Sequence, residues 1–476
     1  MGGGAEPKSR PSRLAFHHRQ CPHETETFVS KDSCLTEYYS LFKLDEECAT
    51  VSSASSAPPP RSRLRLPHAL RALRHRNYRL LFFGQLIAHI GFWMQATAQG
   101  WLVLRLTDAP FWLGAIAAAQ SLPVLILSAP AGTLADRVPK RTLLLITQGT
   151  AMATALLLAT LIFGDAVQVW HVLIAALMVG IASAFENPAR QAFTIELVGR
   201  DDLMNAIALD STVMNGARII GPAVAGALVA ATGEGPAFLF NGLSVLAVIG
   251  GLLMMRLRPF VAPPHRSNWQ QMREGFVYMR HDARVRLLLL QITAHCVFGL
   301  AYFPLMPYFA RNVLGADARG FGVLAATNAA GALVAALVIT LVGDRLPRVG
   351  VRSVALLSYS LLLGAFTLTR SFALAMALLA AIGWAGIVVL TLTNTLLQMV
   401  TPDEMRGRVM GVYMLVVMGV SQISGLILSS VADVIGDVPL VVGCWALVGW
   451  CVQVYLFMLW RRAPRDTAQV APLPRP

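Results

Sequence analysis

The sequence predicts an all-α polytopic membrane protein with twelve transmembrane helices, arranged as two six-helix pseudo-repeats. Three observations predict this fold. Hydrophobic residues make up 55% of the chain and charged residues only 14%, apolar runs of near-membrane length recur along it, and one set of motifs occurs twice. Because a soluble domain carries about 25% charged residues, the composition argues against a soluble protein.

The apolar runs are each close to the roughly 20 residues that one helical crossing of a bilayer needs. Short polar loops separate them, and the mean hydropathy of the chain is +0.58. We expect spans near residues 80–104, 111–135, 142–163, 170–186, 206–229, 237–255, 287–310, 320–343, 353–370, 373–399, 409–432 and 439–460.

The distribution of basic residues predicts the orientation. The odd-numbered loops hold four, whereas the arginine-rich stretch over residues 61–79, the even-numbered loops and the C-terminal segment hold 28. Since basic loops stay in the cytoplasm, we expect cytoplasmic termini and a multi-pass protein of the inner or plasma membrane. No basic stripe with interleaved aromatic residues is present, so we expect no nucleic-acid partner.

The predicted organisation has five parts. They are a disordered, basic-ended cytoplasmic segment over residues 1–73, a first half over 74–255, a cytoplasmic linker over 256–286, a second half over 287–460 and a cytoplasmic tail over 461–476. The start of the chain is polar and rich in serine and proline, as disordered segments are. A second interpretation is an over-extended start of the reading frame.

An internal repeat relates the two halves. Motifs of the first half return in the same order about 202–208 positions later, an offset read from the paired positions of the sequence. The matched residues include Gln85 with Gln291, His89 with His295, Asp136 with Asp344 and Arg137 with Arg345. Two repeated halves are typical of secondary transporters, whose binding site lies between them.

The loop between the second and third predicted spans carries the most specific motif, formed by Gly132, Asp136, Arg137, Lys140 and Arg141. It resembles the signature loop of the major facilitator superfamily, with Pro139 where that family usually has glycine. Three further segments resemble the branch that holds the enterobactin exporter and macrolide efflux permeases, namely 187–191, 217–222 and 402–408.

The resemblance implies that this loop, with Asp344 and Arg345 in the second half, forms a charge network that holds one face closed and breaks during transport. The plainer interpretation is a topology anchor, since each cation at the inner headgroups gains about 1 kcal/mol from anionic lipid.

The fifth predicted span contains a helix-packing motif, Gly221, Pro222 and Gly226. Glycine lets helices approach closely in a membrane, and proline removes a backbone donor and bends the helix. The motif resembles the Gly-Pro motif of exporting major facilitator proteins, although Ala225 stands where a second glycine is common. The alternative is a packing kink without a role in transport.

The same span carries Asn215 and Arg218. A charged arginine near the middle of a bilayer costs at least about 2.5–3.5 kcal/mol, so its side chain is expected to face protein or water. We expect Arg218 to line the substrate pathway with Glu186 or Asp210 as its partner, or else to be locked in a structural ion pair.

The first predicted span gathers four polar residues, Gln85, His89, Gln95 and Gln99. At about 100° per residue they fall within a stripe roughly 120° wide. Polar side chains on one face of a span are expected to line the bundle interior or a cavity, which predicts a pathway lining. A single glutamine would be ordinary interhelical hydrogen bonding.

Further pathway and coupling candidates are isolated polar residues within the spans. An imidazole titrates near pH 6.5 in water and can carry a coupling proton, although a buried histidine can equally be a neutral core residue. The candidates for proton coupling are Glu186, Asp210, His89 and His295. The additional pathway candidates are Asn215, Asn241, Gln291, His295, Asn328 and Asn394.

The chain lacks the motifs of several other function classes. The chain contains no P-loop and no Gly-x-Ser-x-Gly or His-Glu-x-x-His sequence, and its six cysteines form no Cys-x-x-Cys pair. We therefore expect no enzyme, cofactor or metal site, but a monomeric secondary exporter of a small apolar or amphipathic molecule, driven by proton antiport. The alternatives are a lysophospholipid flippase, a small-solute importer or a non-transporting membrane receptor.

Overall fold

The computed structural model describes residues 70–257, 282–345 and 347–462, together with Gly2. Most of the predicted N-terminal segment, linker and C-terminal tail lies outside these residues. The long elements of the described part are α3 (Arg76–Thr107), α4 (Pro110–Arg137), α5 (Lys140–Phe163), α6 (Val169–Thr232), α7 (Gly235–Met254), α9 (Ala283–Ala294), α11 (Ala318–Val342), α12 (Arg348–Leu368), α13 (Phe372–Val400), α14 (Asp403–Leu415), α15 (Ser421–Ile435) and α16 (Val438–Arg462).

The shorter elements are helical turns that extend or join these helices. They are η1 (Arg71–Arg74), η2 (His295–Gly299), η3 (Leu300–Leu305), α10 (Met306–Tyr308), η4 (Phe309–Val313), η5 (Gly343–Arg345) and η6 (Val416–Val420). Every regular element among the described residues is therefore a helix, as the sequence predicts.

Helix α6 contains the fourth and fifth predicted spans. Its 64 residues would reach about 96 Å if straight, three times the roughly 30 Å of a bilayer core. The backbone breaks at Gly199, whose φ of 73° and ψ of 176° are not helical, so α6 consists of two arms. The region 187–205, predicted as a loop, is helical on both sides of this break. Hydropathy does not show the helix in this region, because its residues are polar and yet remain helical.

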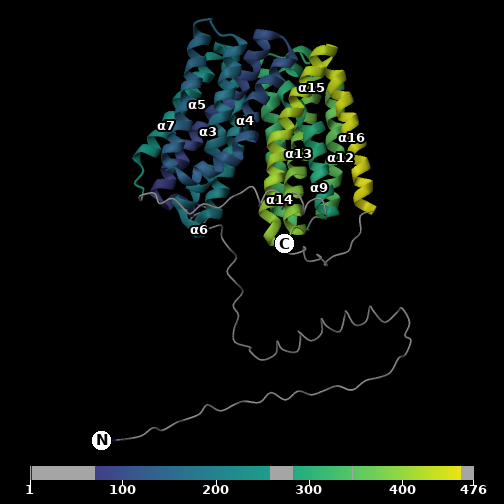
Figure 1. Cartoon of the computed structure of the whole chain (residues 1–476). Coiled ribbons are helices and arrows are strands. Elements are labelled where there is room, and N and C mark those ends of the chain that lie inside the picture. The colour runs from purple at the N-terminus through teal and green to yellow at the C-terminus, as the bar shows by residue number, and fades with distance from the viewer. Residues whose placement is uncertain (1, 3–69, 258–281, 346, 463–476) are drawn as a thin grey trace, which may run out of the picture. The chain divides into compact units, whose positions relative to one another are not determined.

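Eleven helical segments of the described residues are long and apolar enough to cross a membrane, and α6 is one of them. Counting its two arms separately gives the twelve predicted spans. In Figure 1 the helices of the first half, purple to teal, stand beside those of the second half, green to yellow. This confirms the predicted fold class.

The seventh span is irregular. It runs through α9, the π-helical η2, the 3₁₀-helical η3, α10 and the π-helical η4, and it contains Pro304 and Pro307. Both prolines lack a backbone donor and interrupt the hydrogen-bond ladder. Short π-helical insertions are frequent at functional sites, and transporters form their sites from discontinuous helices.

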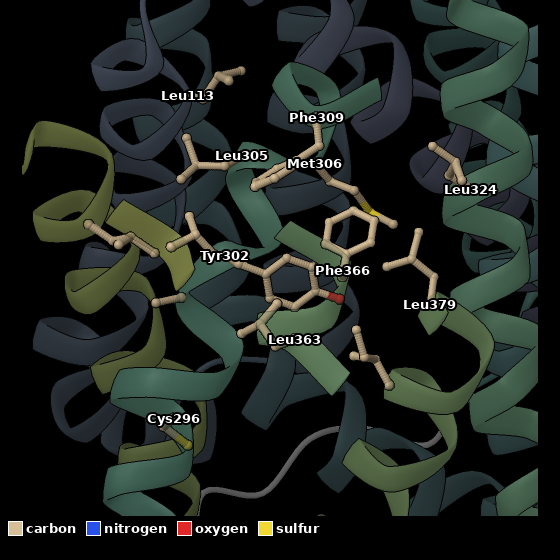
Figure 2. Close-up of a cluster of buried hydrophobic side chains, with 14 of the residues drawn as sticks. Leu113, Cys296, Tyr302, Leu305, Met306, Phe309, Leu324, Leu363, Phe366 and Leu379 are labelled. Atoms are coloured by element: carbon tan, nitrogen blue, oxygen red, sulfur yellow. The ribbon is translucent and has the colours of Figure 1, made fainter. Parts of the chain in front are cut away.

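The core of the second half packs around this irregular span. Figure 2 shows Tyr302, Met306 and Phe309 gathered with Phe366 of α12. The Phe309 and Phe366 ring centroids are 5.0 Å apart, and those of Tyr302 and Phe366 are 6.3 Å apart. These buried rings support the span where its own backbone ladder is interrupted.

The two halves meet where small residues face one another. Helix α4 packs against α15, and α6 packs against α11. A Cβ atom added at Gly226 of α6 would lie 2.7 Å from the Ala318 carbonyl oxygen and 2.9 Å from the Gly322 Cα atom of α11. Glycine at these positions therefore lets the two backbones touch, as is common between membrane helices.

Candidate functional site

A polar cluster in the first half centres on Arg190, in the first arm of α6. Its Nη1 atom lies 3.3 Å from Gln85 Oε1 and 3.3 Å from His89 Nε2, both on α3. Its Nη2 atom lies 3.4 Å from Asn187 Oδ1. Two of the four predicted polar residues of the first span thus contact one cation. From the sequence, Arg190 was noted only as part of the motif over residues 187–191 and was given no site role, because this part of the chain was assigned to a loop.

Two carboxylates complete this cluster. Glu186 accepts a hydrogen bond from Gln148 Nε2 at 3.0 Å, and Asp210 accepts one from the Tyr78 hydroxyl at 2.9 Å. Both carboxylates interact electrostatically with Arg190. The two acids predicted as partners of Arg218 therefore lie beside Arg190 instead. Gln148 and Tyr78 are further site residues that the sequence did not single out.

Arg218 lies apart from these acids, in the second arm of α6. Its guanidinium carbon is 5.7 Å from the centroid of the Trp93 ring of α3, within the range of a cation–π interaction. The other groups that interact with its charge are Tyr302 and Tyr359 of the second half. Arg218 therefore faces the boundary between the halves.

A cavity of about 60 Å³ adjoins Arg218 at this boundary. Both halves contribute to its wall. The lining residues are Trp93, Ala96, Thr97, Arg218 and Pro222 from the first half, and Phe303, Met306, Phe321, Ala325 and Asn328 from the second. Of the predicted pathway residues, Arg218 and Asn328 line it.

The remaining predicted pathway residues of the first half lie elsewhere. Gln95 Oε1 accepts a hydrogen bond from Asn241 Nδ2 of α7 at 2.7 Å, so this pair joins two helices of one half. Asn215 donates to the Ser211 carbonyl of its own helix at 2.8 Å, and Gln99 is half-buried on α3. Of the polar stripe predicted on the first span, Gln85 and His89 therefore contact Arg190, and Gln95 contacts α7.

A related arrangement occurs in the second half. Gln291 Oε1 accepts a hydrogen bond from Arg352 Nη2 at 2.5 Å, and the fully buried Arg352 guanidinium lies 5.8 Å from the centroid of Trp460. His295 packs edge-on against Tyr359 with centroids 4.5 Å apart. The repeated glutamines of the two halves therefore both accept from an arginine.

Asn394 takes no part in this arrangement. Its Oδ1 atom accepts a hydrogen bond from Gln398 Nε2 of the same helix at 2.6 Å. The structure therefore gives this predicted pathway residue a partner within α13.

The predicted gating loop joins α4 to α5. Lys140 forms an ion pair with Glu196 of α6, and Arg141 Nη2 donates to the Leu253 carbonyl of α7 at 2.8 Å. Arg137 is exposed at the end of α4, and Arg345 is exposed in η5. Two of the cations thus bind neighbouring helices of the first half.

Three further positions of the predicted gate are Asp136, Asp344 and Gly132. The side chains of Asp136 and Asp344 lie outside what the structure describes. A Cβ atom added at Gly132 would have no atom within 4 Å. Packing in this conformation therefore does not require glycine at that position.

The helix-packing motif of the second α6 arm contacts both halves. A Cβ atom at Gly221 would lie 2.5 Å from Trp93 Cβ, so Gly221 lets α3 approach and brings Trp93 beside Arg218. Pro222 lines the cavity, and Gly226 contacts α11 as described above. The three residues position one wall of the cavity.

Ion pairs lie at the end of the bundle formed by the odd-numbered loops. Arg105 forms a bidentate pair with Glu234, with distances of 2.9 and 3.2 Å. Arg311 of the second half lies 3.4 Å from Asp108 Oδ1 and donates to the Leu104 carbonyl at 3.3 Å. Trp101 stacks on Phe321, with centroids 6.3 Å apart. The contacts of Arg311 and Trp101 join the halves on one side of the cavity, whereas the Arg105–Glu234 pair lies within the first half.

Comparison with known proteins identifies relatives of this chain. Residues 68–476 match the transmembrane secretion effector family. The chain is 26% identical over 259 residues to a staphyloferrin A transporter of Staphylococcus aureus, covering 54% of the chain and 65% of that relative, which is under two thirds of its length. It is 26% identical over 351 residues to the multidrug efflux pump Tap of Mycobacterium tuberculosis, covering 70% and 81%.

Two further comparisons agree. The chain is 24% identical over 342 residues to the enterobactin exporter of Shigella boydii, covering 71% of the chain and 81% of the exporter. A bacterial homologue of the human lysosomal transporter Spinster, solved in an inward-facing and unoccupied conformation, aligns with a TM-score of 0.62 at 14% identity. The alignment covers 83% of this chain and 98% of that one, and it shows a shared fold.

Proposed function

The chain belongs to the transmembrane secretion effector family of major facilitator transporters, and on that basis we propose that it exports a small apolar or amphipathic molecule by proton antiport. Membership makes it a multi-pass membrane transporter and not an enzyme, and it confirms the resemblance seen in the sequence motifs. Relatives named as a multidrug efflux pump and an enterobactin exporter support the export direction. The cargo classes that follow from these names are drugs, siderophores and other metabolites.

The observation that carries the proposal is the cavity between the halves. Its lining comes from both halves, so any relative movement of the halves changes its access and its shape. Contacts through Arg311 and Trp101 lie on the side of the odd-numbered loops. Alternating access follows if these contacts break on one side while others form on the opposite side.

The carboxylates beside Arg190 support proton coupling. Glu186 and Asp210 both interact with the charge of Arg190, and a proton on either acid removes one of these attractions. With both acids protonated, Arg190 would be held mainly by the neutral groups of Gln85 and Asn187. Protonation thereby changes the hold of α6 on α3, which couples proton binding to helix movement. His89 and His295 are the second choice for the coupling site.

The predicted topology belongs to the same proposal. We infer halves over residues 74–255 and 287–460, cytoplasmic termini and a monomer in the inner or plasma membrane. The excess of basic residues in the even-numbered loops supports this orientation. The loop residues from Gly132 to Arg141, with Asp344 and Arg345, would then act as the gate on the cytoplasmic side.

Energised uptake into inverted membrane vesicles tests the function. A panel of macrolides, siderophores and lipophilic cations is supplied outside, with a pH gradient imposed across the membrane. We expect gradient-dependent accumulation of one or more compounds, and loss of accumulation in the Asp136→Asn and Glu186→Gln variants. Asp165→Asn, which makes the same chemical change on an exposed loop, is the control and is expected to accumulate normally.

Other results of this experiment favour the alternative functions. Accumulation without a gradient, or in right-side-out vesicles only, contradicts proton-driven export and favours an importer. Movement of labelled lysophospholipid in liposomes without any soluble solute favours a flippase. Correctly inserted protein that moves no compound and no lipid contradicts transport of these classes and favours a receptor.

A further inference from the structure

Among the described residues, Arg190, Arg218 and Arg352 lie inside the bundle, and they differ in their surroundings. Arg190 has Glu186 and Asp210 within electrostatic range. Arg352 donates to Gln291 and is enclosed completely by protein. Arg218 adjoins the cavity between the halves, and the groups that interact with its charge are the Trp93 ring and two tyrosines. Among the described residues, no carboxylate pairs with Arg218.

The depth of Arg218 makes this arrangement costly. It lies fourteen residues before Thr232, the last residue of α6, which corresponds to about 21 Å along the helix. A cation near the middle of a membrane is costly unless it faces protein, water or an opposite charge. A cation–π contact offsets only part of this cost. An anion that enters the cavity would supply the remainder.

The cavity wall defines the rest of the ligand. Trp93, Phe303 and Phe321 present aromatic rings to it, and Phe303 belongs to the irregular seventh span. Aromatic walls favour an apolar or aromatic body, because flat rings stack on one another and exclude water. One cation and several rings at one boundary therefore match a molecule with an anionic group on an aromatic or apolar frame.

From this geometry we propose that the exported molecule is an organic anion whose carboxylate, sulfonate or comparable acidic group is bound by Arg218 at the cavity between the halves. This inference rests on the proposed export function and names its substrate class. A cationic molecule would bring a second positive charge against Arg218 in a region of low dielectric, where like charges repel strongly. The protein is therefore expected to discriminate against lipophilic cations.

The present cavity is smaller than a bound substrate. At about 60 Å³ it is below the roughly 300–1,000 Å³ of typical ligand pockets. Because its wall is formed by both halves, it widens when the halves separate, and Arg218 then becomes accessible from the widened side. Binding is therefore expected in the conformation in which the halves have parted.

Three small molecules with one ring system and different charges test the proposal. They are tritiated 1-naphthalenesulfonate, neutral 1-naphthalenesulfonamide and cationic 1-naphthalenemethylammonium. Equilibrium binding to the purified full-length protein in detergent is measured for the wild type, Arg218→Gln and Arg218→Lys. Arg370→Gln removes an equal charge from an exposed loop and serves as the control, and protein-free micelles correct for partitioning.

We expect the wild type and Arg370→Gln to bind the sulfonate at least about tenfold more tightly than the ammonium compound, a factor that corresponds to about 1.4 kcal/mol. Arg218→Gln is expected to lose this preference, and Arg218→Lys to keep part of it because the charge remains. Equal elution profiles in size-exclusion chromatography establish that the variants are folded. A preference for the ammonium compound, no charge preference, or a preference that survives in Arg218→Gln overturns the proposal, as does failure to bind the sulfonate.

The vesicle experiment keeps the two proposals separate. Binding of the sulfonate that depends on Arg218, without energised accumulation, overturns proton-driven export and leaves the anion site in place. If cations accumulate in energised vesicles equally in the wild type and in Arg218→Gln, export is supported and the anion site is overturned.

Discussion

Substituting Gly226 by alanine tests how the halves are held together. The new Cβ atom would lie 2.7 Å from the Ala318 carbonyl oxygen and 2.9 Å from the Gly322 Cα atom, where ordinary contact begins at 3.4 Å. Both obstacles are backbone atoms, so α6 and α11 must separate locally by about 0.5–0.7 Å, and overpacking of this kind costs about 1–3 kcal/mol. The cost applies only while the halves touch at this crossing.

The expected consequence is a shift of the conformational equilibrium. A penalty of about 1–3 kcal/mol on one conformation changes its population relative to the other by roughly 5- to 150-fold. Gly226→Ala is therefore expected to favour the state in which the halves are parted on the side of the odd-numbered loops. Spin labels at Asp165→Cys and Ser371→Cys, which lie in exposed loops of the two halves on that side, report this as a longer distance in pulsed electron resonance.

Gly216 provides a matched control on the same helix. A Cβ atom there has no atom within 4 Å, so Gly216→Ala makes the same chemical change without a steric conflict. The native cysteines are replaced in all samples so that only the two intended sites carry labels. An unchanged distance in Gly226→Ala, or an equal change in Gly216→Ala, would refute the argument that close packing at this crossing holds the halves together.

Three further substitutions test single contacts, each by thermal unfolding in detergent. Tyr78→Phe removes the hydroxyl that donates to Asp210 and is expected to destabilise the protein by roughly 0.6–1.7 kcal/mol, the range of interhelical hydrogen bonds; an unchanged unfolding temperature contradicts this. Gln291→Leu deprives the buried Arg352 of its acceptor and is expected to cost about 1–3 kcal/mol, whereas the double variant with Arg352→Met recovers stability because no charge stays buried. Gly199→Ala forces an L side chain to a φ of 73° and a ψ of 176°, a region used almost only by glycine, with an expected cost of about 1–3 kcal/mol, and a neutral result would show that the break in α6 relaxes freely.

The sequence was sufficient to predict the helices and their number. Hydropathy predicts these features because span length and apolar composition depend on the bilayer alone. It failed between residues 187 and 205, where a polar stretch continues as a helix to the break at Gly199. Arg190 was overlooked for that reason, although its side chain contacts α3.

The pairing of buried charges was beyond the sequence. Arg218 and the acids Glu186 and Asp210 all lie in α6. Asp210 and Arg218 share its second arm, about 12 Å apart along the axis, whereas the angle between the arms decides where Glu186 and Arg190 of the first arm lie relative to them. The structure brings the acids to Arg190 and leaves Arg218 beside Trp93. Hydropathy is the same for every such angle, so only the packing of side chains distinguishes between them.

The glutamine–arginine contact that occurs in both predicted halves has different surroundings in each. In the first half Gln85 accepts from an arginine that has two acids nearby. In the second half Gln291 accepts from Arg352, to which no carboxylate is paired among the described residues. Under the proposed proton antiport, the charge changes of the transport cycle would take place in the first half, and the second half would serve as the fixed surface against which it moves. A chimaera of two first halves would then carry the arginine with its two acids twice and would lack the fixed surface.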